Sequence, residues 1–539
     1  MFLDIFVIPV PHDVYLLHYP SKQRLIRNAT IPVPFLALPC RMTLATVYTR
    51  APLSMHAPLV RVEVHLAGGL PAMTLVGLPE KAVKESKDRV RAAIINSGFE
   101  FPSKHITINL APAELPKDGA RYDLAIALGI LIASDQLPVD DIAQYEFHGE
   151  LALSGALRPV GGILPCALAA TDAHRRIITA PDNHHEAALV AADNVHSAEN
   201  LAEIAAVLHR RQDWPPPPPP PIRPPRSYPD YADVIGQHQA KRALLVAAAG
   251  GHHVLMSGPP GTGKSMLAQR FPGILPPMDE REAIESAALR SLAGSFSPAD
   301  WRIRPYRAPH HSSSSSALVG GGTIPRPGEI SLAHHGVLFL DELPEYDRRV
   351  LEMLREPLEN GHITISRAAM KSDFPARFQL IAAMNPCPCG YHGDPERACN
   401  DTPDQIARYR HKISGPLLDR IDIHLTVARL TPAQLREQQQ AHPETSADLR
   451  AQSTAARRIQ LERQGRPNAA LNGSLLERHL HAEADVLPLL DRAAERMHLS
   501  MRSYQRILKV ARSIADLAAS PTVSRQHLAE ALQYRGGSV

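Results

Sequence analysis

The chain has 539 residues, more than one hydrophobic core normally organises, and its length predicts roughly two to four domains. A hydrophobic fraction of 44% and a charged fraction of 21% are ordinary for globular proteins and exclude wholesale disorder. The formal net charge of +3 is too small to indicate a nucleic-acid partner by itself.

Residues 1–41 mix prolines, histidines and short apolar runs without a helical or alternating period. We expect this segment to be a disordered or non-conserved extension, with Met42 as the working initiation site. The apolar start contains Asp4 and lacks a basic region before it, and no run of eighteen apolar residues occurs. We therefore expect neither a signal peptide nor a membrane span. The five cysteines do not resemble a disulfide framework, which favours a cytoplasmic location.

Residues 42–211 are predicted to form an α+β domain. Residues 60–66 alternate strictly between apolar and polar side chains, a diglycine turn follows, and residues 73–76 resume the alternation, which predicts a half-buried hairpin. Residues 79–98 have apolar positions at helical spacing, and residues 105–110 alternate again. Strands and helices therefore share this part of the chain.

A proline-rich segment, residues 212–229, marks the clearest domain boundary. It contains seven consecutive prolines, which cannot support helix or sheet hydrogen bonding and favour a stiff polyproline II spacer. A ligand for a proline-binding domain is the other interpretation. We prefer the spacer, because the segment joins two folded parts.

Residues 230–429 alternate short buried strands with helices. The apolar runs 253–257, 337–340 and 378–384 are bounded by turn signals, which predicts a parallel, doubly wound sheet and an α/β fold class. Residues 430–539 are predicted to form a separate helical lid. One helix of this lid has an apolar face that consists of Tyr504, Ile507, Leu508, Ala511, Ile514 and Ala515.

A phosphate-binding loop follows the first of these strands. Its sequence is G-P-P-G-T-G-K-S, and it comprises Gly258, Pro259, Pro260, Gly261, Thr262, Gly263, Lys264 and Ser265. We expect backbone amides to hold the polyphosphate of ATP, Lys264 to reach its terminal phosphates, and the Ser265 hydroxyl to bind Mg²⁺. A simple glycine-rich turn is the alternative, but the strand before the loop and the helix after it disfavour it.

Three polar residues end the next two strands at the edge where parallel sheets bind ligands. Asp341 is expected to support the Mg²⁺ shell, and Glu342 to polarise the attacking water. Asn385 ends the neighbouring strand and is predicted to orient that water near the γ-phosphate. An ordinary pair of acids at a strand end is the alternative.

Two arginines are candidates for further contacts with the nucleotide. Arg420 is a candidate arginine finger, a cation that one subunit supplies to the nucleotide of its neighbour. A surface salt bridge is the other interpretation of Arg420. Arg502 stands at the start of the lid helix and is expected to reach the nucleotide of its own chain.

With these motifs the chain resembles the YifB/ComM family of magnesium-chelatase-like AAA+ proteins, from residue 42 to its end. Besides the phosphate-binding loop, the resemblance rests on V-G-L-P-E-K-A-V-K-E-S-K-D-R-V, N-L-A-P-A-E-L-P-K-D-G, R-A-P-H-H, P-G-E-I-S-L-A-H-H-G-V-L-F-L-D-E-L-P-E, M-N-P-C-P-C-G-Y and S-G-P-L-L-D-R-I-D. It implies a homo-hexameric ring that binds branched or single-stranded DNA. It also implies a helicase that drives branch migration during natural transformation and homologous recombination. A chelatase-type ATPase that remodels a protein complex is the alternative.

One local feature favours contact with a polynucleotide. Asn360-Gly361, a strand at residues 362–366 and then Arg367, Lys371 and Arg377 predict a basic hairpin before the Asn385 strand. Such a hairpin can line the pore of a ring and contact phosphates, and Arg367 and Lys371 are the predicted DNA contacts. Basic residues on a solvated loop are the plainer interpretation.

The amino-terminal domain resembles the Lon protease fold through residues 116–119 and 149–162, which read P-K-D-G and G-E-L-A-L-S-G-A-L-R-P-V-G-G. Where Lon proteases have their nucleophilic serine, residues 120–122 read Ala-Arg-Tyr. After the second motif, residues 163–166 read Ile-Leu-Pro-Cys, without a lysine. A serine-lysine dyad is therefore missing, and we expect no proteolysis.

A zinc site is suggested by Cys387, Cys389 and Cys399. Members of the family often have a further cysteine where this chain has Asp401, so Asp401 or His392 would have to supply the fourth ligand. Free thiols remain the alternative, because C-x-C is not the usual spacing of zinc ligands.

Two histidine pairs, His310-His311 and His334-His335, also invite a metal interpretation. Adjacent side chains in a helix or strand point apart. We therefore expect a structural or phosphate-sensing role for both pairs rather than metal binding.

Overall fold

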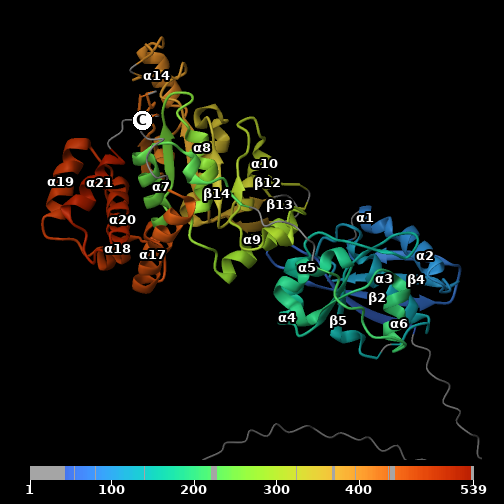
Figure 1. Cartoon of the computed structure of the whole chain (residues 1–539). Coiled ribbons are helices and arrows are strands. Elements are labelled where there is room, and N and C mark those ends of the chain that lie inside the picture. The colour runs from blue at the N-terminus through green and yellow to red at the C-terminus, as the bar shows by residue number, and fades with distance from the viewer. Residues whose placement is uncertain are drawn as a thin grey trace, which may run out of the picture. The chain divides into compact units, whose positions relative to one another are not determined.

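The computed structural model describes most of the chain between residues 43 and 535 (Figure 1). The described residues are 43–53, 55–78, 81–138, 140–219, 227–322, 324–366, 371–394, 396–431, 433–434, 436 and 444–535. The predicted extension 1–41, Met42 and Arg367 lie outside them. The described parts of the proline-rich segment, residues 212–219 and 227–229, contain neither helix nor strand.

A mixed sheet is the first large element of the described chain. Its strands, in spatial order, are β1 (Leu44–Arg50), β2 (Leu59–Ala67), β4 (His105–Ala111) and β3 (Ala72–Val76). The alternating pattern of β2 buries Val60, Val62 and Val64 on one face. That face packs against helix α3 (Asp123–Ala133), all of whose residues are buried.

The predicted hairpin between residues 60–66 and 73–76 is wrong. Strand β2 has β1 on one edge and β4 on the other, both antiparallel, so β3 has no edge of β2 to join. Strand β3 instead runs parallel to β4, with Ala72 opposite His105. Alternation determines which face of a strand is buried, but it does not determine which strand lies beside it.

A second, parallel sheet follows in the same part of the chain. Its strands, in spatial order, are β5 (Tyr145–Phe147), β8 (Arg176–Thr179) and β9 (Val195–Ser197). Helices α4 (Ile163–Asp172) and α5 (Pro181–Ala191) connect them. The remaining elements are α1 (Lys81–Lys84), α2 (Ser86–Asn96), β6 (Glu150–Leu151), β7 (Leu157–Arg158) and α6 (Leu201–Leu208).

A five-stranded parallel sheet carries the predicted nucleotide site. Its strands, in spatial order, are β11 (Tyr306–Arg307), β14 (Val337–Leu340), β17 (Gln379–Met384), β10 (Val254–Ser257) and β18 (Ile423–Thr426). Ser257, the last residue of β10, lies opposite Met384, the last residue of β17. The carboxyl ends of the central strands therefore meet at one edge, and the predicted parallel α/β sheet is confirmed.

Helices and two small hairpins surround this sheet. The helices are α7 (His238–Gly250), α8 (Lys264–Arg270), α9 (Glu280–Leu292), α10 (Ser315–Val319), α11 (Glu329–Leu332), α12 (Arg348–Met353), α13 (Arg355–Asn360), α14 (Pro403–Arg410) and α15 (Gly415–Leu418). One hairpin pairs β12 (Gly320–Gly321) with β13 (Arg326–Pro327). The other pairs β15 (His362–Ser366) with β16 (Lys371–Pro375), so the predicted hairpin at residue 362 is confirmed.

The carboxyl-terminal part of the chain is helical, as predicted. Its long helices are α17 (Ser446–Gln464), α18 (Gly473–Leu480), α19 (Val486–Met497), α20 (Met501–Leu517) and α21 (Arg525–Gln533). Helix α20 begins where the Ser500 hydroxyl accepts a hydrogen bond from the Ser503 backbone N–H. Its predicted apolar face is buried at Ile507, Leu508, Ala511, Ile514 and Ala515.

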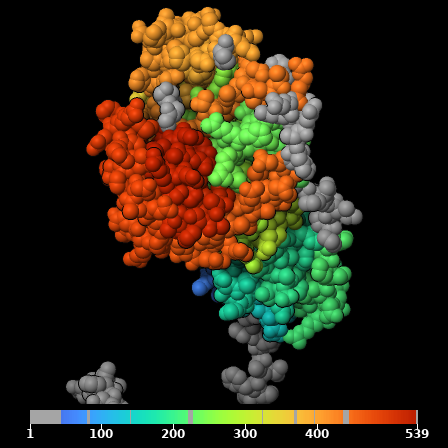
Figure 2. Space-filling view, turned by 60° about the vertical axis from the view of Figure 1, so that its left-hand side comes forward, coloured from blue at the N-terminus to red at the C-terminus, as the bar shows by residue number. Residues whose placement is uncertain are grey.

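The carboxyl-terminal helices share one hydrophobic core with the five-stranded sheet. Ile507 and Ala511 of α20 belong to the same buried cluster as Leu244 of α7 and Val254 of β10. Figure 2 shows the carboxyl-terminal helices in orange to red beside green residues of the sheet domain, and α20 packs directly on α7. Helix α20 therefore belongs to the same core as β10, the strand that leads into the phosphate-binding loop.

Candidate active site

The loop at residues 258–263 connects β10 with α8. Part of its backbone has a conformation that only glycine adopts easily. Gly261 and Gly263 have positive φ angles of 78° and 89°. At Gly258, a Cβ atom would lie 2.2 Å from the Val427 carbonyl oxygen, so no side chain fits there. These three glycines explain the local geometry, and they leave the loop amides unobstructed for an anion.

Lys264 connects the loop with the neighbouring strand. Its side chain is 8% exposed. Its Nζ donates hydrogen bonds to the carbonyl oxygens of Gly258 and Pro259, at 2.6 and 2.9 Å, and to Asn385 Oδ1 at 3.2 Å. Burial lowers the pKa of Lys264, while the nearby Asp341 and Glu342 carboxylates act in the opposite direction. Two predicted site residues, Lys264 and Asn385, are thus in direct contact.

Ser265 and Asp341 form the second contact across the site. The Ser265 hydroxyl donates a hydrogen bond of 2.6 Å to Asp341 Oδ2. A hydroxyl and a carboxylate at this separation are oxygen ligands of the kind that Mg²⁺ prefers, and they leave further positions for water and phosphate oxygens. The two residues therefore fit the metal role that their positions predict.

Glu342 differs from Asp341 because its side chain is exposed. Its backbone has a φ angle of 50°, which is unusual for a residue other than glycine and turns the chain sharply after β14. Its backbone N–H donates to Asp341 Oδ1 at 3.0 Å. The two adjacent acids therefore differ in exposure, and Asp341 rather than Glu342 bonds to Ser265.

His311 contacts Glu342, a contact that was not predicted, although a structural or phosphate-sensing role was expected for the pair His310-His311. The Nδ1 atom of His311 lies 3.2 Å from Glu342 Oε2. The loop that carries it follows β11, the strand beside β14, and Tyr346 fixes this loop by donating a hydrogen bond of 2.6 Å to the Pro309 carbonyl oxygen. The sequence signal was R-A-P-H-H, whose last residue comes shortly after a strand that neighbours the Asp341 strand.

The expectation that adjacent histidines point apart is wrong for both pairs. The ring centroids are 4.1 Å apart in His310-His311 and 3.8 Å apart in His334-His335. Neither pair lies in a regular helix or strand, and His335 has a φ angle of 56°, so the alternation rule does not apply.

His334 and His335 both bind Glu285. Their Nε2 atoms lie 3.2 and 2.8 Å from Glu285 Oε2. The Nδ1 atom of His334 accepts a hydrogen bond of 2.9 Å from the Arg377 backbone N–H, so Nε2 carries the ring proton and donates to the carboxylate. These hydrogen bonds connect Glu285 with the start of β17 and so give the histidine pair a structural role. A structural role was one of the two that were expected for it.

Arg420 bonds to the carboxylate of Glu359, and the charge of Arg502 acts on the same carboxylate. Arg420 is 6% exposed and donates to Glu359 and, at 2.8 Å, to the Pro416 carbonyl oxygen. The hydrogen bond from Arg420 lowers the pKa of Glu359, and the charges of Arg420 and Arg502 add to the effect. Lys264, Ser265, Asp341 and Asn385 instead gather at the end of β10, β14 and β17.

Of the two predicted DNA contacts, Lys371 lies on the β15–β16 hairpin. Lys371 is exposed and stands opposite Ser366 at the described end of the hairpin. Arg367 lies outside the described residues. Arg377, at the base of the hairpin, is also exposed. A cross-strand hydrogen bond of 2.6 Å from Thr364 to Asp373 ties the two strands together.

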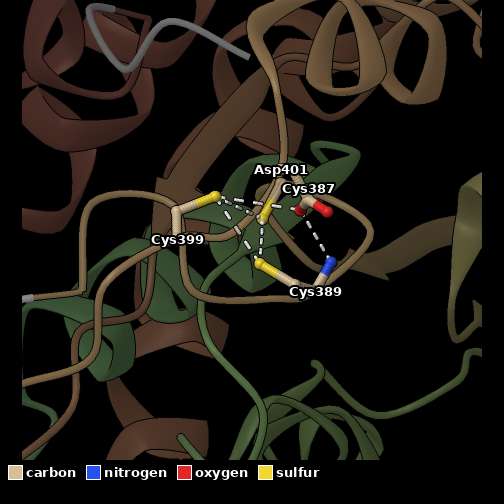
Figure 3. Close-up of side chains that lie close together, drawn as sticks. All are labelled: Cys387, Cys389, Cys399 and Asp401. Carbon is tan, nitrogen blue, oxygen red and sulfur yellow. Dashed lines mark hydrogen bonds between the residues drawn. The ribbon is translucent and has the colours of Figure 1, made fainter.

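The three cysteines that were considered as zinc ligands lie side by side, with Asp401 against them (Figure 3). Their closest sulfur atoms, those of Cys387 and Cys389, are 3.3 Å apart. Of the two candidates for the fourth ligand, Asp401 brings a side-chain oxygen into the cluster, whereas His392 contributes its backbone N–H to Cys387 Sγ.

The chain matches three family profiles. The profile for the magnesium chelatase subunit ChlI matches residues 230–435, a second profile for subunit ChlI of Mg-chelatase matches residues 62–183, and the carboxyl-terminal ChlI profile matches residues 443–535. In the described part of the chain, each helix is too short or too polar to cross a membrane.

Whole-chain similarity extends to curated bacterial proteins. The chain is 50% identical over 501 residues to the competence protein ComM of Haemophilus influenzae, which covers 92% of this chain and 98% of that protein. It is 49% identical over 495 residues to YifB of Salmonella typhimurium, which covers 92% of this chain and 97% of that protein. A 178-residue stretch is 28% identical to the magnesium-chelatase 38 kDa subunit of Rhodobacter capsulatus and covers 29% of this chain and 50% of that subunit.

Proposed function

The chain belongs to the YifB/ComM family of magnesium-chelatase-like proteins, and from this premise we propose that it is an AAA+ ATP hydrolase that uses Mg²⁺ and drives DNA branch migration. The observation that carries the ATPase proposal is the convergence of Lys264, Ser265, Asp341 and Asn385 within hydrogen-bond distance at one sheet edge. The DNA proposal rests on the similarity to ComM, a competence protein, along nearly the whole of both chains. Integration of DNA during natural transformation and homologous recombination is the process we assign to it.

The contacts of the site indicate how its residues would act on ATP. Lys264 holds loop carbonyls, and its ammonium group can exchange these acceptors for the more strongly charged terminal phosphates. Ser265 and Asp341 would hold Mg²⁺, which neutralises the charge that develops on the phosphates. Glu342 would polarise the attacking water after its carboxylate leaves His311, and Asn385 would orient that water.

We further propose a homo-hexameric ring in which Arg420 acts on the nucleotide of the neighbouring subunit. The basic β15–β16 hairpin would then contact DNA phosphates in the pore. Lys371 is exposed at the described end of this hairpin, so its ammonium group is available to a phosphate. Strand β17 leads from the base of the hairpin to Asn385, which gives a short path from a DNA contact to the residue that orients the water.

The test compares DNA-stimulated ATP hydrolysis and branch migration in the wild type and in the double variant Arg367→Ala/Lys371→Ala. The variant should keep basal hydrolysis but lose stimulation by forked and single-stranded DNA. The slope of DNA affinity against salt should fall by about one unit per phosphate contact removed. Arg458→Ala is the matched control, because Arg458 is an exposed arginine on α17 that pairs with Glu462 within the same helix. Unchanged DNA binding in the double variant would place the DNA path elsewhere.

A chelatase-type ATPase that remodels a protein complex is the second candidate. The 28% identity to a magnesium-chelatase subunit supports it. Both candidates would use the same nucleotide site, so the site itself does not separate them. The two differ in what stimulates the ATPase. A wild type whose hydrolysis is indifferent to forked, single-stranded and duplex DNA would favour the protein-remodelling function.

A Lon-like fold for residues 42–211 remains our proposal for the amino-terminal domain, without proteolytic activity. At the first position, residues 120–122 supply no serine. At the second, residues 163–166 supply no lysine. The Cys166 side chain there is completely buried, and burial raises the pKa of its thiol to about 12. A neutral thiol inside the core is a poor nucleophile. ATP-dependent degradation of casein by the purified protein would contradict this proposal.

A further inference from the structure

A compact group of four side chains lies in the loop directly after β17. The sulfur atoms of Cys387, Cys389 and Cys399 are separated by 3.3, 3.5 and 3.6 Å. Asp401 Oδ2 lies 3.8 Å from Cys399 Sγ. Figure 3 shows the three thiols pointing toward one another, with the Asp401 carboxylate closing the group. All four ligand atoms lie within 4.8 Å of one another.

These separations match a tetrahedral metal site. A Zn–S distance of about 2.3 Å places two sulfur ligands about 3.8 Å apart in a tetrahedron. The three sulfur separations are within about 0.5 Å of that value. In a [4Fe–4S] cluster each thiolate binds a different iron atom, so its cysteine sulfurs must lie much farther apart than they do in this group.

We propose that Cys387, Cys389, Cys399 and Asp401 bind one Zn²⁺ ion. Three thiolates select a thiophilic metal over Mg²⁺ or Ca²⁺, and four protein ligands close the coordination sphere, as in structural zinc sites. The spacing C-x-C is unusual for zinc, but the fold brings Cys399 and Asp401 back to the first two cysteines and thereby completes the ligand set.

Backbone groups of the same loop complete the environment of the site. The Cys389 N–H donates a hydrogen bond of 2.8 Å to Asp401 Oδ2, and this bond orients the carboxylate. The His392 N–H donates to Cys387 Sγ at 3.3 Å, and the N–H groups of Tyr391 and Asn400 donate to Cys389. Amide donors of this kind offset the negative charge of the thiolates.

The loop after β17 that carries the proposed zinc ligands, residues 387–401, and the residues next to it touch the nucleotide site at two places. Asn385, two residues before Cys387, accepts a hydrogen bond of 3.2 Å from Lys264. Gly390, with a φ angle of 84°, packs so closely on the phosphate-binding loop that a Cβ atom would lie 2.8 Å from Pro260 Cδ. The ion would therefore hold Asn385 in its position and stabilise the contact with Pro260, as a structural and not a catalytic metal.

Metal content of the purified full-length protein tests the site without reference to ATP or DNA. We expect about one zinc ion per chain by elemental mass spectrometry. Cys399→Ser and Asp401→Asn should lose most of it, whereas Asp401→Cys should retain it as a four-thiolate site. Glu396→Gln is the matched control, because it removes a carboxylate from the same loop that pairs with Arg429 outside the cluster.

Substitution with Co²⁺ identifies the ligands directly. The Co²⁺ protein should absorb in the thiolate-to-metal charge-transfer region, and Cys399→Ser should reduce this absorption while Glu396→Gln leaves it unchanged. Zinc removal from the wild type should lower kcat at least about tenfold, and added Zn²⁺ should restore it. A folded wild type that holds neither Zn²⁺ nor Co²⁺ after incubation and dialysis would overturn the proposal. Equal metal content in wild type and Cys399→Ser would overturn the ligand set.

Discussion

At the scale of single residues, Lys264 is expected to contribute to the affinity for ATP and Glu342 to the rate of its hydrolysis. Lys264 is buried and bonded to the phosphate-binding loop, whereas Glu342 is exposed and contacts His311. An interaction that already exists with bound substrate contributes to affinity, and one made only in the transition state contributes to rate. The two residues should therefore fail in different ways when they are replaced.

Lys264→Ala should weaken ATP binding roughly ten- to hundredfold, because it removes a charged hydrogen-bond donor worth about 1.5–3 kcal/mol. Glu342→Gln should keep the affinity within about twofold and lower kcat by roughly 10²–10⁴, the usual contribution of a general base. Equilibrium binding of a fluorescent ATP analogue and steady-state hydrolysis measure the two effects. Equal loss of binding in both variants would contradict the roles assigned.

His311 is expected to restrain Glu342 while the site is idle. Its Nδ1 atom lies 3.2 Å from the carboxylate that must face the attacking water. His311→Ala should therefore raise basal ATP hydrolysis by up to about fivefold, which corresponds to the ~1 kcal/mol of an exposed polar pair. His310→Ala is the control, because His310 bonds to Ser312 rather than to Glu342. A fall in basal kcat in His311→Ala alone would show that His311 assists hydrolysis instead.

At the scale of elements, two histidines, the half-buried His253 and the buried His334, support the start of β17. His253 Nδ1 accepts a hydrogen bond of 3.0 Å from the Leu380 N–H, and His334 Nδ1 accepts one of 2.9 Å from the Arg377 N–H. Both rings must be neutral at Nδ1 to accept these bonds. Burial lowers the pKa of each histidine to about 4.

Acidification should consequently destabilise the protein. The folded pKa of about 4 lies below the unfolded value near 6.5, so the unfolded chain binds more protons in this window, and stability rises with pH across it. Each histidine contributes at most about 3 kcal/mol, fully present above roughly pH 6.5 and lost as the pH falls toward 4. The melting temperature should therefore drop between pH 7.5 and pH 5.

His253→Asn should flatten this pH dependence, because an amide oxygen can accept the same backbone hydrogen bond without binding a proton. His362→Gln serves as the comparison, since His362 is exposed on β15. If the melting temperature of His253→Asn depends on pH as steeply as that of the wild type, other groups control the acid response.

The elements also show what sequence alone could predict. Strand 337–340 was predicted with its observed ends, because the acid pair at 341–342 and the preceding apolar run mark it locally. The partner of β3 and the contact of His311 with Glu342 were not predicted. Both depend on which strands are neighbours, and that is decided by packing between segments distant in the sequence. The convergence of His334 and His335 depends in turn on the left-handed backbone of His335, which the residue type does not reveal.

At the scale of the whole molecule, each active site of the proposed ring would contain residues from two neighbouring chains. Arg420 pairs with Glu359, and the charge of Arg502 acts on the same carboxylate. Glu359 is half exposed, so a phosphate can take its place as the partner of Arg420, although the Arg420 side chain is 7% exposed and would have to move outward to reach a neighbouring subunit. A finger held ready in this way would be delivered to the neighbouring nucleotide.

Mixed rings separate a finger from a local salt bridge. Arg420→Ala and Glu342→Gln should each be inactive alone and should recover ATPase activity when mixed, because an Arg420→Ala subunit keeps Glu342 and receives Arg420 from its Glu342→Gln neighbour. Mixing Arg420→Ala with the double variant Arg420→Ala/Glu342→Gln should give no recovery. Glu359→Gln removes the salt bridge but keeps the cation, so it should retain most of the activity if Arg420 is a finger. If Glu359→Gln is as inactive as Arg420→Ala, and the mixed rings stay inactive, Arg420 serves its own chain by stabilising the contact with Glu359.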